Sequence, residues 1–399
     1  MTEQNNGNDN PETPGYRRDT VLTHAGRHPH EYHGFVNTPL VRASTVLFPD
    51  VDALQKRMGM RYPYGLTNTP TIEALTEAVD ALENSAGTVL VPSGLAAITV
   101  PILAFATPGT RILVPDNVYW PTRRFCNETL IRQGVETLYY DPMVGGEIAR
   151  QFGPDNTILL FEAPGSNTFE TPDLTAMVAA AKSAGVVTMM DNTWATPLFF
   201  RPIDHGIDIS LQAGTKYLAG HSDLLIGTVS ANETAWPVLK QYHRNIGTQA
   251  GTEEIWLTLR GMRTLGVRLD RHEKSGLEIA NWLAGRSEVR QVLHPALPSC
   301  PGHENWAALI GRSNGLFAFE LDASEGQALA FLDALRIFGL GYSWGGFESL
   351  AVPAELKLTR TTCKWTGGPV IRLHVGLEDV GDLIEDLERG FATLHAHAG

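Results

Sequence analysis

Cysteine is scarce in this chain: only Cys126, Cys300 and Cys363 occur among its 399 residues. The three are far apart, odd in number and without CxxC spacing, so neither a disulfide framework nor a zinc site is supported. We therefore expect no metal, and a reducing, cytoplasmic location is the simplest interpretation.

Positive charge is also in short supply, because 31 basic residues face 44 acidic ones and the formal net charge is −13. Such a chain does not suit nucleic acid or an anionic membrane, which both need clustered Lys and Arg. An apolar run of about 18 residues is missing, and the first twenty residues lack the apolar segment of a secretory signal. We expect neither a nucleic-acid nor a membrane partner, and any bound phosphate must be held by local groups.

The chain is expected to divide into four segments. Residues 1–19 are polar and are expected to form a disordered tail. Residues 20–69 mix short extended stretches with Pro, Gly and aromatic residues, which indicates an irregular arm. Residues 70–255 alternate short apolar strands with helices, and residues 256–399 indicate a smaller α+β unit.

The alternating segment predicts a mostly parallel sheet covered by helices on both faces. One helix is expected in TPTIEALTEAVDALEN, with a threonine cap and Ile72, Leu75, Val79 and Leu82 on one face. The expected strands of the sheet are 88–92, 111–116, 135–141, 157–165, 186–192 and 207–217.

Ligands in such sheets bind beyond the carboxyl ends of the strands. Four places in the sequence meet that condition, each just past an expected strand or in the loop after it. They are Ser93-Gly94, Tyr119, Asp191 and Thr215-Lys216.

Lys216 lies in LQAGTKYLAGHSD, after an apolar strand and among small residues. Lysine is seldom buried without a reason, and an amine used for Schiff-base chemistry must be partly deprotonated by burial or a neighbouring cation. Asp191, at the end of VVTMMDN, is a carboxylate of the kind that keeps the ring nitrogen of pyridoxal phosphate (PLP) protonated. An exposed loop lysine and a turn-forming aspartate are the alternative interpretations.

Ser93-Gly94-Leu95 opens an expected helix, whose free N–H groups and partial positive charge suit a phosphate. Many Ser-Gly turns only cap helices, and this is the alternative interpretation of Ser93-Gly94. Thr215 adds a hydroxyl donor beside Lys216.

Tyr119 follows a strand, where it is able to stack on a pyridine ring or to serve as an ordinary core or surface aromatic. Arg372 lies within the apolar strand of GGPVIRLHVG, and a buried arginine needs a partner. A substrate α-carboxylate held by two hydrogen bonds is one such partner, and a structural salt bridge is the other.

Several segments between about residues 20 and 395 together resemble the transsulfuration enzymes, which are the PLP-dependent family of Cys/Met metabolism. The segments are TPTIEALTEAVDALE, PSGLAAI, EAPGS, DNTWATP, AGTKYLAGHSD, RGMRTLGVRL and RLHVGLEDVGDLIEDLERGF. GYSWGGFES is similar to the β-lyase branch, because γ-lyases and γ-synthases usually have SLGG there. The resemblance implies the type I PLP-dependent transferase-like fold.

The activity implied by this resemblance is a carbon–sulfur lyase reaction. L-cystathionine would undergo β-elimination to homocysteine, pyruvate and ammonia, as in methionine biosynthesis. A γ-lyase, γ-synthase or homoserine-ester sulfhydrylase reaction on the same fold is the alternative, and a non-catalytic PLP-binding protein is another. A nucleotide-binding α/β protein is disfavoured, because no GxGxxG or GxxxxGK[ST] element follows the early strands.

The resemblance also assigns roles to individual residues. Lys216 would hold PLP as an imine, Asp191 would pair with the ring nitrogen and Tyr119 would stack on the ring. Further cofactor contacts are expected from Ser93, Gly94, Leu95, Thr215 and Tyr64. The substrate would be bound by Arg372, Ser343, Trp344 and Tyr64.

Two positions depart from the pattern of the family, and both concern the phosphate. The usual YGR element is Tyr64-Gly65-Leu66 here, and the serine often found three residues before the lysine is Ala213. Arg61, Thr67 or Asn68 are the nearby candidates to replace the missing arginine. The resemblance implies a homotetramer built as a dimer of dimers, in which Tyr64 reaches the site of the neighbouring subunit.

Overall fold

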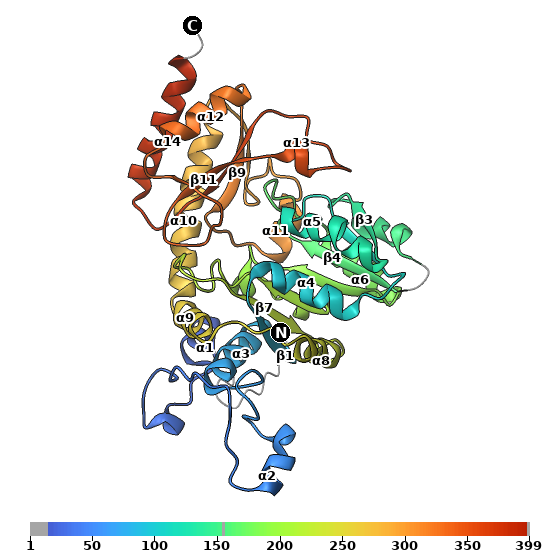
Figure 1. Cartoon of the computed structure of the whole chain (residues 1–399). Coiled ribbons are helices and arrows are strands. Elements are labelled where there is room, and N and C mark those ends of the chain that lie inside the picture. Colours follow the sequence, from blue (N-terminus) through green and yellow to red (C-terminus); the bar gives the residue numbers. More distant parts are fainter. Residues whose placement is uncertain (1–14, 154–155, 397–399) are drawn as a thin grey trace, which may run out of the picture.

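The computed structural model describes residues 15–153 and 156–396, which form two sheets and the helices that cover them (Figure 1). The larger sheet has seven strands in the order β1-β7-β6-β5-β4-β2-β3. Their bounds are β1 Gly87–Val91, β2 Arg111–Pro115, β3 Glu136–Tyr140, β4 Thr157–Glu162, β5 Val187–Asp191, β6 Ile209–Gln212 and β7 Gly227–Ala231. Part of the expected tail, residues 1–14, lies outside the described residues.

The predicted mostly parallel sheet is confirmed, because only β7 runs antiparallel to its neighbours. The sequence pattern missed β7, whose residues GTVSA are mostly small or hydroxylated although all five are buried. Thr88 and Ser230 explain why polar residues are tolerated there, since their hydroxyl oxygens lie 2.7 Å apart across the strands.

Strand β6 is shorter than the expected strand 207–217. It ends at Gln212, and the Lys216 N–H then donates to the Ala213 carbonyl at 3.0 Å to form a turn. The lysine therefore sits on a loop beyond the carboxyl end of β6 and not within the strand.

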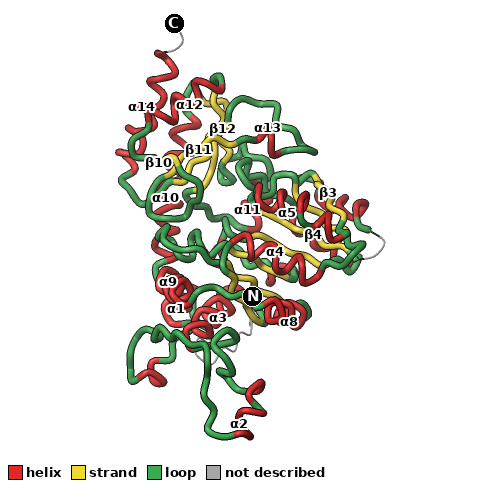
Figure 2. Tube along the Cα trace, viewed as in Figure 1, coloured by secondary structure: helices red, strands yellow, loops and turns green. Residues whose placement is uncertain are grey.

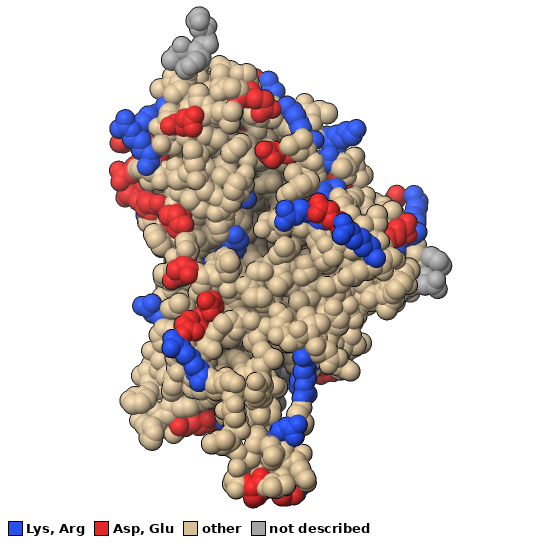
Figure 3. Space-filling view, in the orientation of Figure 1, with Lys and Arg blue, Asp and Glu red and all other residues tan. Residues whose placement is uncertain are grey.

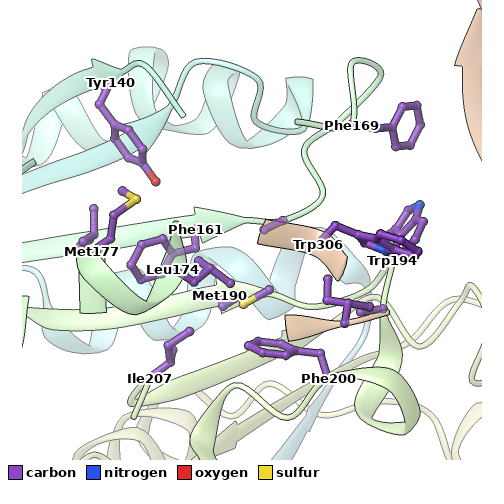
Figure 4. Close-up of a cluster of buried hydrophobic side chains, with 14 of the residues drawn as sticks. Tyr140, Phe161, Phe169, Leu174, Met177, Met190, Trp194, Phe200, Ile207 and Trp306 are labelled. Atoms are coloured by element: carbon purple, nitrogen blue, oxygen red, sulfur yellow. The ribbon is translucent and has the colours of Figure 1, made fainter. Parts of the chain in front are cut away.

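Helices cover both faces of the larger sheet, as expected. One face packs against α4 (Gly94–Phe105), α5 (Trp120–Glu128) and α8 (Trp236–Ile246). The other face packs against α6 (Leu174–Ser183), α7 (Thr196–Phe199) and α11 (His303–Leu309), as the buried side chains in Figure 4 illustrate.

The expected helix with the threonine cap is confirmed as α3 (Pro70–Glu83). The Thr69 hydroxyl accepts a hydrogen bond from the Ile72 N–H, and the four apolar side chains of its inner face are buried. Helix α3 packs on α9 (Thr252–Met262) and α1 (Arg18–His24) and closes the end of the sheet near β1.

The smaller sheet has the order β10-β11-β12-β9-β8. It packs on α10 (Leu265–Ala284), α12 (Glu325–Ala334) and α14 (Val380–Ala396) around rings such as Phe331 and Phe391. Its strands are β8 Val289–Leu293, β9 Leu316–Leu321, β10 Gly339–Leu340, β11 Leu350–Ala354 and β12 Val370–His374. Strands β10 and β11 were not expected, because one has two residues and the other contains a proline.

A buried ionic network joins the two units. Asp116, after β2, accepts hydrogen bonds from the Arg123 guanidinium at 2.7 Å and the Arg360 guanidinium at 3.3 Å. It also accepts from the backbone N–H groups of Thr361, Thr362 and Cys363, which follow α13 (Leu356–Thr359). One carboxylate of the large unit therefore anchors a loop of the small unit.

The segment 33–69 extends away from the body of the chain and consists mostly of loops around the short α2 (Val51–Gln55), as Figure 2 shows. It exposes several large apolar side chains, among them Phe35, Leu47 and Val51.

Acidic and basic side chains are interspersed on the face that Figure 3 shows. Among the described helices, none is long and apolar enough to span a membrane.

Candidate active site

A cavity of about 200 Å³ opens beyond the carboxyl ends of β1, β4, β5 and β6, where the sequence placed its candidate site. It brings together nine residues that the sequence singled out, although they span 280 positions of the chain. These residues are Ser93, Gly94, Leu95, Tyr119, Asp191, Thr215, Lys216, Trp344 and Arg372.

The Lys216 amine points into this cavity and donates a hydrogen bond to the Ser343 hydroxyl at 2.6 Å. Burial, and after it the charge of Arg372, lower the pKa of Lys216 to about 8 against the opposing charge of Asp191. A pKa near 8 leaves a sizeable fraction of free amine at neutral pH, which is the form that attacks a carbonyl carbon. The structure excludes the alternative of an exposed loop lysine.

Asp191 ends β5 and faces the same cavity. Its carboxylate accepts from the Thr193 hydroxyl at 2.5 Å and from the Thr193 N–H at 3.0 Å. The Thr193 hydroxyl in turn accepts from the Ala213 N–H at 2.9 Å, which ties β5 to the loop that carries Lys216. Burial raises the pKa of Asp191, whereas the Thr193 hydrogen bonds and the Lys216 charge favour its ionised form.

Glu162 is a site residue that sequence reasoning missed. It is the register partner of Asp191 on β4 and lines the same cavity. Its carboxyl accepts from the Tyr119 N–H at 2.8 Å and from the Ser166 hydroxyl. Burial, and after it the Asp191 charge, raise the pKa of Glu162 to about 8 against the hydrogen bonds from Ser166 and Tyr119. Of this pair, Glu162 is the residue that holds a proton at neutral pH. The rule that ligands bind beyond the carboxyl ends of strands, applied to the segment EAPGS, would have identified Glu162.

The N-terminus of α4 forms one end of the cavity. Ser93 caps the helix, because its hydroxyl accepts from the Ala96 N–H at 3.1 Å. Gly94 permits close packing here: a Cβ atom at this position would lie 2.5 Å from the Ala213 Cβ. The N–H groups of Gly94 and Leu95 belong to the first helical turn, whose donors have no partner within the helix. The Thr215 hydroxyl is engaged with the Ile226 backbone, to which it donates at 3.2 Å.

Arg372 enters from β12 of the small unit and lines the opposite side of the cavity. Its guanidinium donates to the Ser343 carbonyl at 3.3 Å. Arg372 forms no ion pair with any residue in 15–153 or 156–396, which argues against the salt-bridge interpretation. Burial lowers the pKa of Arg372 to about 10, so the side chain still carries its charge at neutral pH and can pair with a carboxylate.

Two aromatic residues complete the cavity wall. Tyr119 precedes α5 and is 44% exposed, and burial followed by the Asp191 charge raises its pKa. Trp344 packs edge-on against the Tyr217 ring, and its own ring centre lies 5.5 Å from the Lys216 amine. An exposed tyrosine over the cavity is available to stack on a flat ring.

Two sequence-predicted residues do not line this cavity. Ser343 lies behind the cavity wall, where its hydroxyl binds Lys216 and its carbonyl binds Arg372. Tyr64 lies on the extended segment, where its hydroxyl is 3.4 Å from that of Ser44. Leu66 is exposed on the same segment.

Arg61, a candidate substitute for the missing arginine, already pairs with carboxylates of its own chain. Its guanidinium donates to Glu73 at 2.9 Å and to Glu31 at 3.0 Å. The Asn68 amide, another candidate, donates to the Arg61 carbonyl at 3.1 Å.

These donors and charges fit PLP. A lysine amine of lowered pKa, a carboxylate for a ring nitrogen and a helix N-terminus for a phosphate meet in one cavity. The fold and this site define a PLP-dependent enzyme.

The comparisons with known proteins agree with the site. The family model for "Cys/Met metabolism PLP-dependent enzyme" matches residues 19–392, and the chain belongs to this family. The predicted family, type I fold and cofactor are thereby confirmed.

Three similar proteins illustrate the range of the family. The cystathionine beta-lyase of Haemophilus influenzae is 42% identical over 95% of this chain and 99% of its own. An L-alanine/L-glutamate racemase of Wolbachia pipientis is 37% identical over 95% of this chain and 98% of its own. The structure of a cystathionine gamma synthase from Xanthomonas oryzae, in complex with aminoacrylate and cysteine, matches with a TM-score of 0.88 at 31% identity and covers 96% of this chain and 99% of that one.

Proposed function

We propose that this protein is a carbon–sulfur lyase that cleaves L-cystathionine by β-elimination to homocysteine, pyruvate and ammonia, as a step of methionine biosynthesis. The observation that carries the proposal is that the Lys216 amine shares one cavity with Asp191 and Arg372, whose charges both act on it, and with Trp344. Similarity to a beta-lyase over nearly the whole chain supports the choice of reaction.

PLP, held by Lys216, Asp191 and the N-terminus of α4, would supply the electron sink for the reaction at the substrate Cα. Arg372 holds the substrate α-carboxylate by charge-assisted hydrogen bonds, so that the Cα–H bond faces Lys216. The Lys216 amine removes the Cα proton and then delivers a proton to the departing sulfur. Ser343 steers the amine through its hydrogen bond.

Asp191 and its neighbours set the charge at the far end of the site. The Thr193 hydrogen bonds hold the Asp191 carboxylate ionised, where it would stabilise a positive ring nitrogen. Glu162, which carries a proton, adds no second negative charge beside it. Tyr119, fixed through its N–H by Glu162, would cover the ring.

We also propose that the chain works as a homotetramer, built as a dimer of dimers, in the cytoplasm. The exposed apolar side chains of segment 33–69 support a contact with another copy of the chain. Tyr64 would then enter the site of the neighbouring subunit. The division into an arm at 20–69, a PLP-binding unit at 70–255 and a small unit at 256–399 belongs to the same proposal.

Product analysis tests the reaction. The protein loaded with PLP is incubated with L-cystathionine, and the keto acid is identified. Pyruvate with homocysteine supports the proposal, whereas 2-oxobutyrate with cysteine would show γ-elimination. Racemisation of L-alanine or L-glutamate without keto acid would assign the chain to the activity of its Wolbachia relative. Lys216→Ala must lose the activity, and a near-normal rate in this variant would refute the scheme.

A further inference from the structure

The turn Ser343–Gly346 lies directly against the backbone of Lys216, in a conformation that needs support. Gly345 has φ +83°, and a Cβ atom at this position would come within 2.9 Å of the Tyr217 nitrogen and 3.1 Å of the Lys216 Cα. Ser343 also has a positive φ, of 102°, which is unfavourable for a residue with a side chain. Contacts from outside the turn must hold it in place.

Strand β12 supplies these contacts through two residues that point the same way. Arg372 and His374 are two positions apart and therefore share one face of the strand. The Arg372 guanidinium donates to the Ser343 carbonyl at 3.3 Å, and His374 Nε2 lies 3.0 Å from the Gly345 nitrogen, whose N–H points at it. The same Nε2 is 3.1 Å from the Gly346 carbonyl.

His374 is buried in a way that keeps its ring neutral. Its side chain is 1% exposed and packs against the rings of Tyr217 and His272. Burial lowers the pKa of His374 well below its ordinary value, and nearby positive charges add to the shift. A neutral ring carries one proton: with the proton on Nδ1, Nε2 accepts the Gly345 N–H, and with the proton on Nε2 it donates to the Gly346 carbonyl, so Nε2 binds the turn in either tautomer.

The His272 ring beside His374 has a backbone partner of its own. His272 Nδ1 is 2.8 Å from the Val375 carbonyl and must donate to it, which leaves His272 Nε2 as an acceptor. Within the described part of the chain, His272 Nε2 and His374 Nδ1 are both buried without a hydrogen-bond partner.

We propose that His374 is a positioning residue: its neutral imidazole holds the Ser343–Gly346 turn so that the Ser343 hydroxyl can receive the hydrogen bond of the Lys216 amine. The proposal rests on the function given above, in which Lys216 moves the protons. His374 does not line the cavity and acts only through the turn.

Three variants test this role. His374→Phe keeps a ring of similar size but removes the nitrogen that binds Gly345. His374→Gln places an amide near the position of Nε2, where it can accept from Gly345 and donate to Gly346. His294→Phe is the matched control, because His294 is also a buried histidine that accepts one backbone N–H, from Ala296 at 3.1 Å, but lies outside the cavity.

The first readout is hydrogen exchange over residues 343–346 in protein without PLP, measured by mass spectrometry. Exchange at Gly345 is expected to be slow in the wild type, in His374→Gln and in the control, and faster in His374→Phe. Rapid exchange at Gly345 in the wild type would overturn the proposal whether or not any variant folds.

The second readout is the pKa of Lys216 in the same protein, from the pH dependence of its acetylation. We expect it to rise from about 8 toward the ordinary lysine value in His374→Phe, because a loosened turn admits water, and to stay in place in the other variants. The charges that act on Lys216, those of Arg372 and Asp191, are unchanged in all of them, as are Glu162 and Tyr119, the other titratable groups of the cavity.

The third readout is turnover of cystathionine by the PLP-loaded protein. His374→Phe is expected to lose about a hundredfold in kcat with a smaller change in KM, as for a misplaced reacting group, and His374→Gln should recover most of it. An unchanged Lys216 pKa and kcat in folded His374→Phe would overturn the proposal. If the wild type makes no pyruvate but the first two readouts move as expected, the proposed reaction is wrong and the role of His374 stands.

Discussion

The Lys216 amine and the Ser343 hydroxyl are 2.6 Å apart, although 127 positions separate them in the chain. Lys216 follows a strand of the large sheet, whereas Ser343 precedes a strand of the small one. The site is therefore complete only when the two units are packed together. Contacts that join the units should influence the reactivity of the lysine.

Arg372 should affect both substrate binding and the lysine. Arg372→Leu removes the partner proposed for the α-carboxylate, so KM for cystathionine should rise by one to two orders of magnitude, as for a lost charge-assisted hydrogen bond of about 1.5–3 kcal/mol. It also removes a positive charge that lowers the pKa of Lys216, which should then rise above about 8. Arg372→Lys, the control, should keep the Lys216 pKa low. A Leu variant with unchanged KM would contradict the assigned role.

Glu162 should make the protein less stable as pH rises. Its pKa of about 8 in the folded chain lies above the ordinary carboxyl value of about 4.3. The protonated form of Glu162 therefore contributes fully to the free energy of unfolding below a pH of about 4.3. This contribution is lost as the pH rises through about 8. Glu162→Gln cannot ionise, so its melting temperature should match that of the wild type at pH 4 and exceed it at pH 8.5. The control Glu147→Gln, at an exposed position, should show no such pH-dependent difference in melting temperature from the wild type. If Glu162→Gln also shows none, the Glu162 carboxyl is ionised at both pH values and the prediction is wrong.

Asp116 should be a strong determinant of stability. Burial alone would raise its pKa, but hydrogen bonds from Cys363, Thr361 and Thr362 and from Arg123 outweigh burial and lower it. Asp116→Asn leaves buried guanidinium groups without their counter-charge and should cost about 3–5 kcal/mol in the free energy of unfolding.

The depressed pKa of Asp116 also sets the pH range over which its carboxylate stabilises the folded chain. Its stabilisation is fully present above the ordinary aspartate value of about 3.9, declines as pH falls below that value and is lost only below the depressed pKa of the folded chain. Urea unfolding at pH 7 and pH 3.5 should therefore show a larger difference between wild type and Asp116→Asn at pH 7. Asp52→Asn, which breaks an exposed pair with Lys56, should cost well under 1 kcal/mol. An equally small cost at Asp116 would contradict its role in joining the units.

Leu66 should weaken the hold on the phosphate of PLP. The resemblance to the family implies an arginine at this position that would bind the phosphate across the proposed dimer, and Arg61 is already paired with Glu73 and Glu31. Leu66→Arg should lower the dissociation constant of PLP about tenfold, which corresponds to one charge-assisted hydrogen bond. Fluorescence titration measures the change, with Leu66→Gln as the uncharged control. An unchanged constant in Leu66→Arg would place residue 66 away from the phosphate.

Local sequence patterns were sufficient to predict most of the helices and strands of the large unit. The helix with Ile72, Leu75, Val79 and Leu82 and the buried parallel strands follow from periodicity, because burial on one or both faces imposes it. The pattern failed at β7, which is buried without being apolar, and at β11, which contains Pro353.

By itself, the sequence determined the fold class, the family, the cofactor and the choice of Lys216 and Asp191, since each rests on short local motifs that can be recognised one by one along the chain. Only the tertiary structure decided which distant groups act on that lysine. The contacts of Ser343, Arg372 and His374 arise where the small sheet packs beside the large one, and no local pattern encodes that packing. The lowered pKa of Lys216 has the same origin, because burial and the charge of Arg372 exist only in the folded chain.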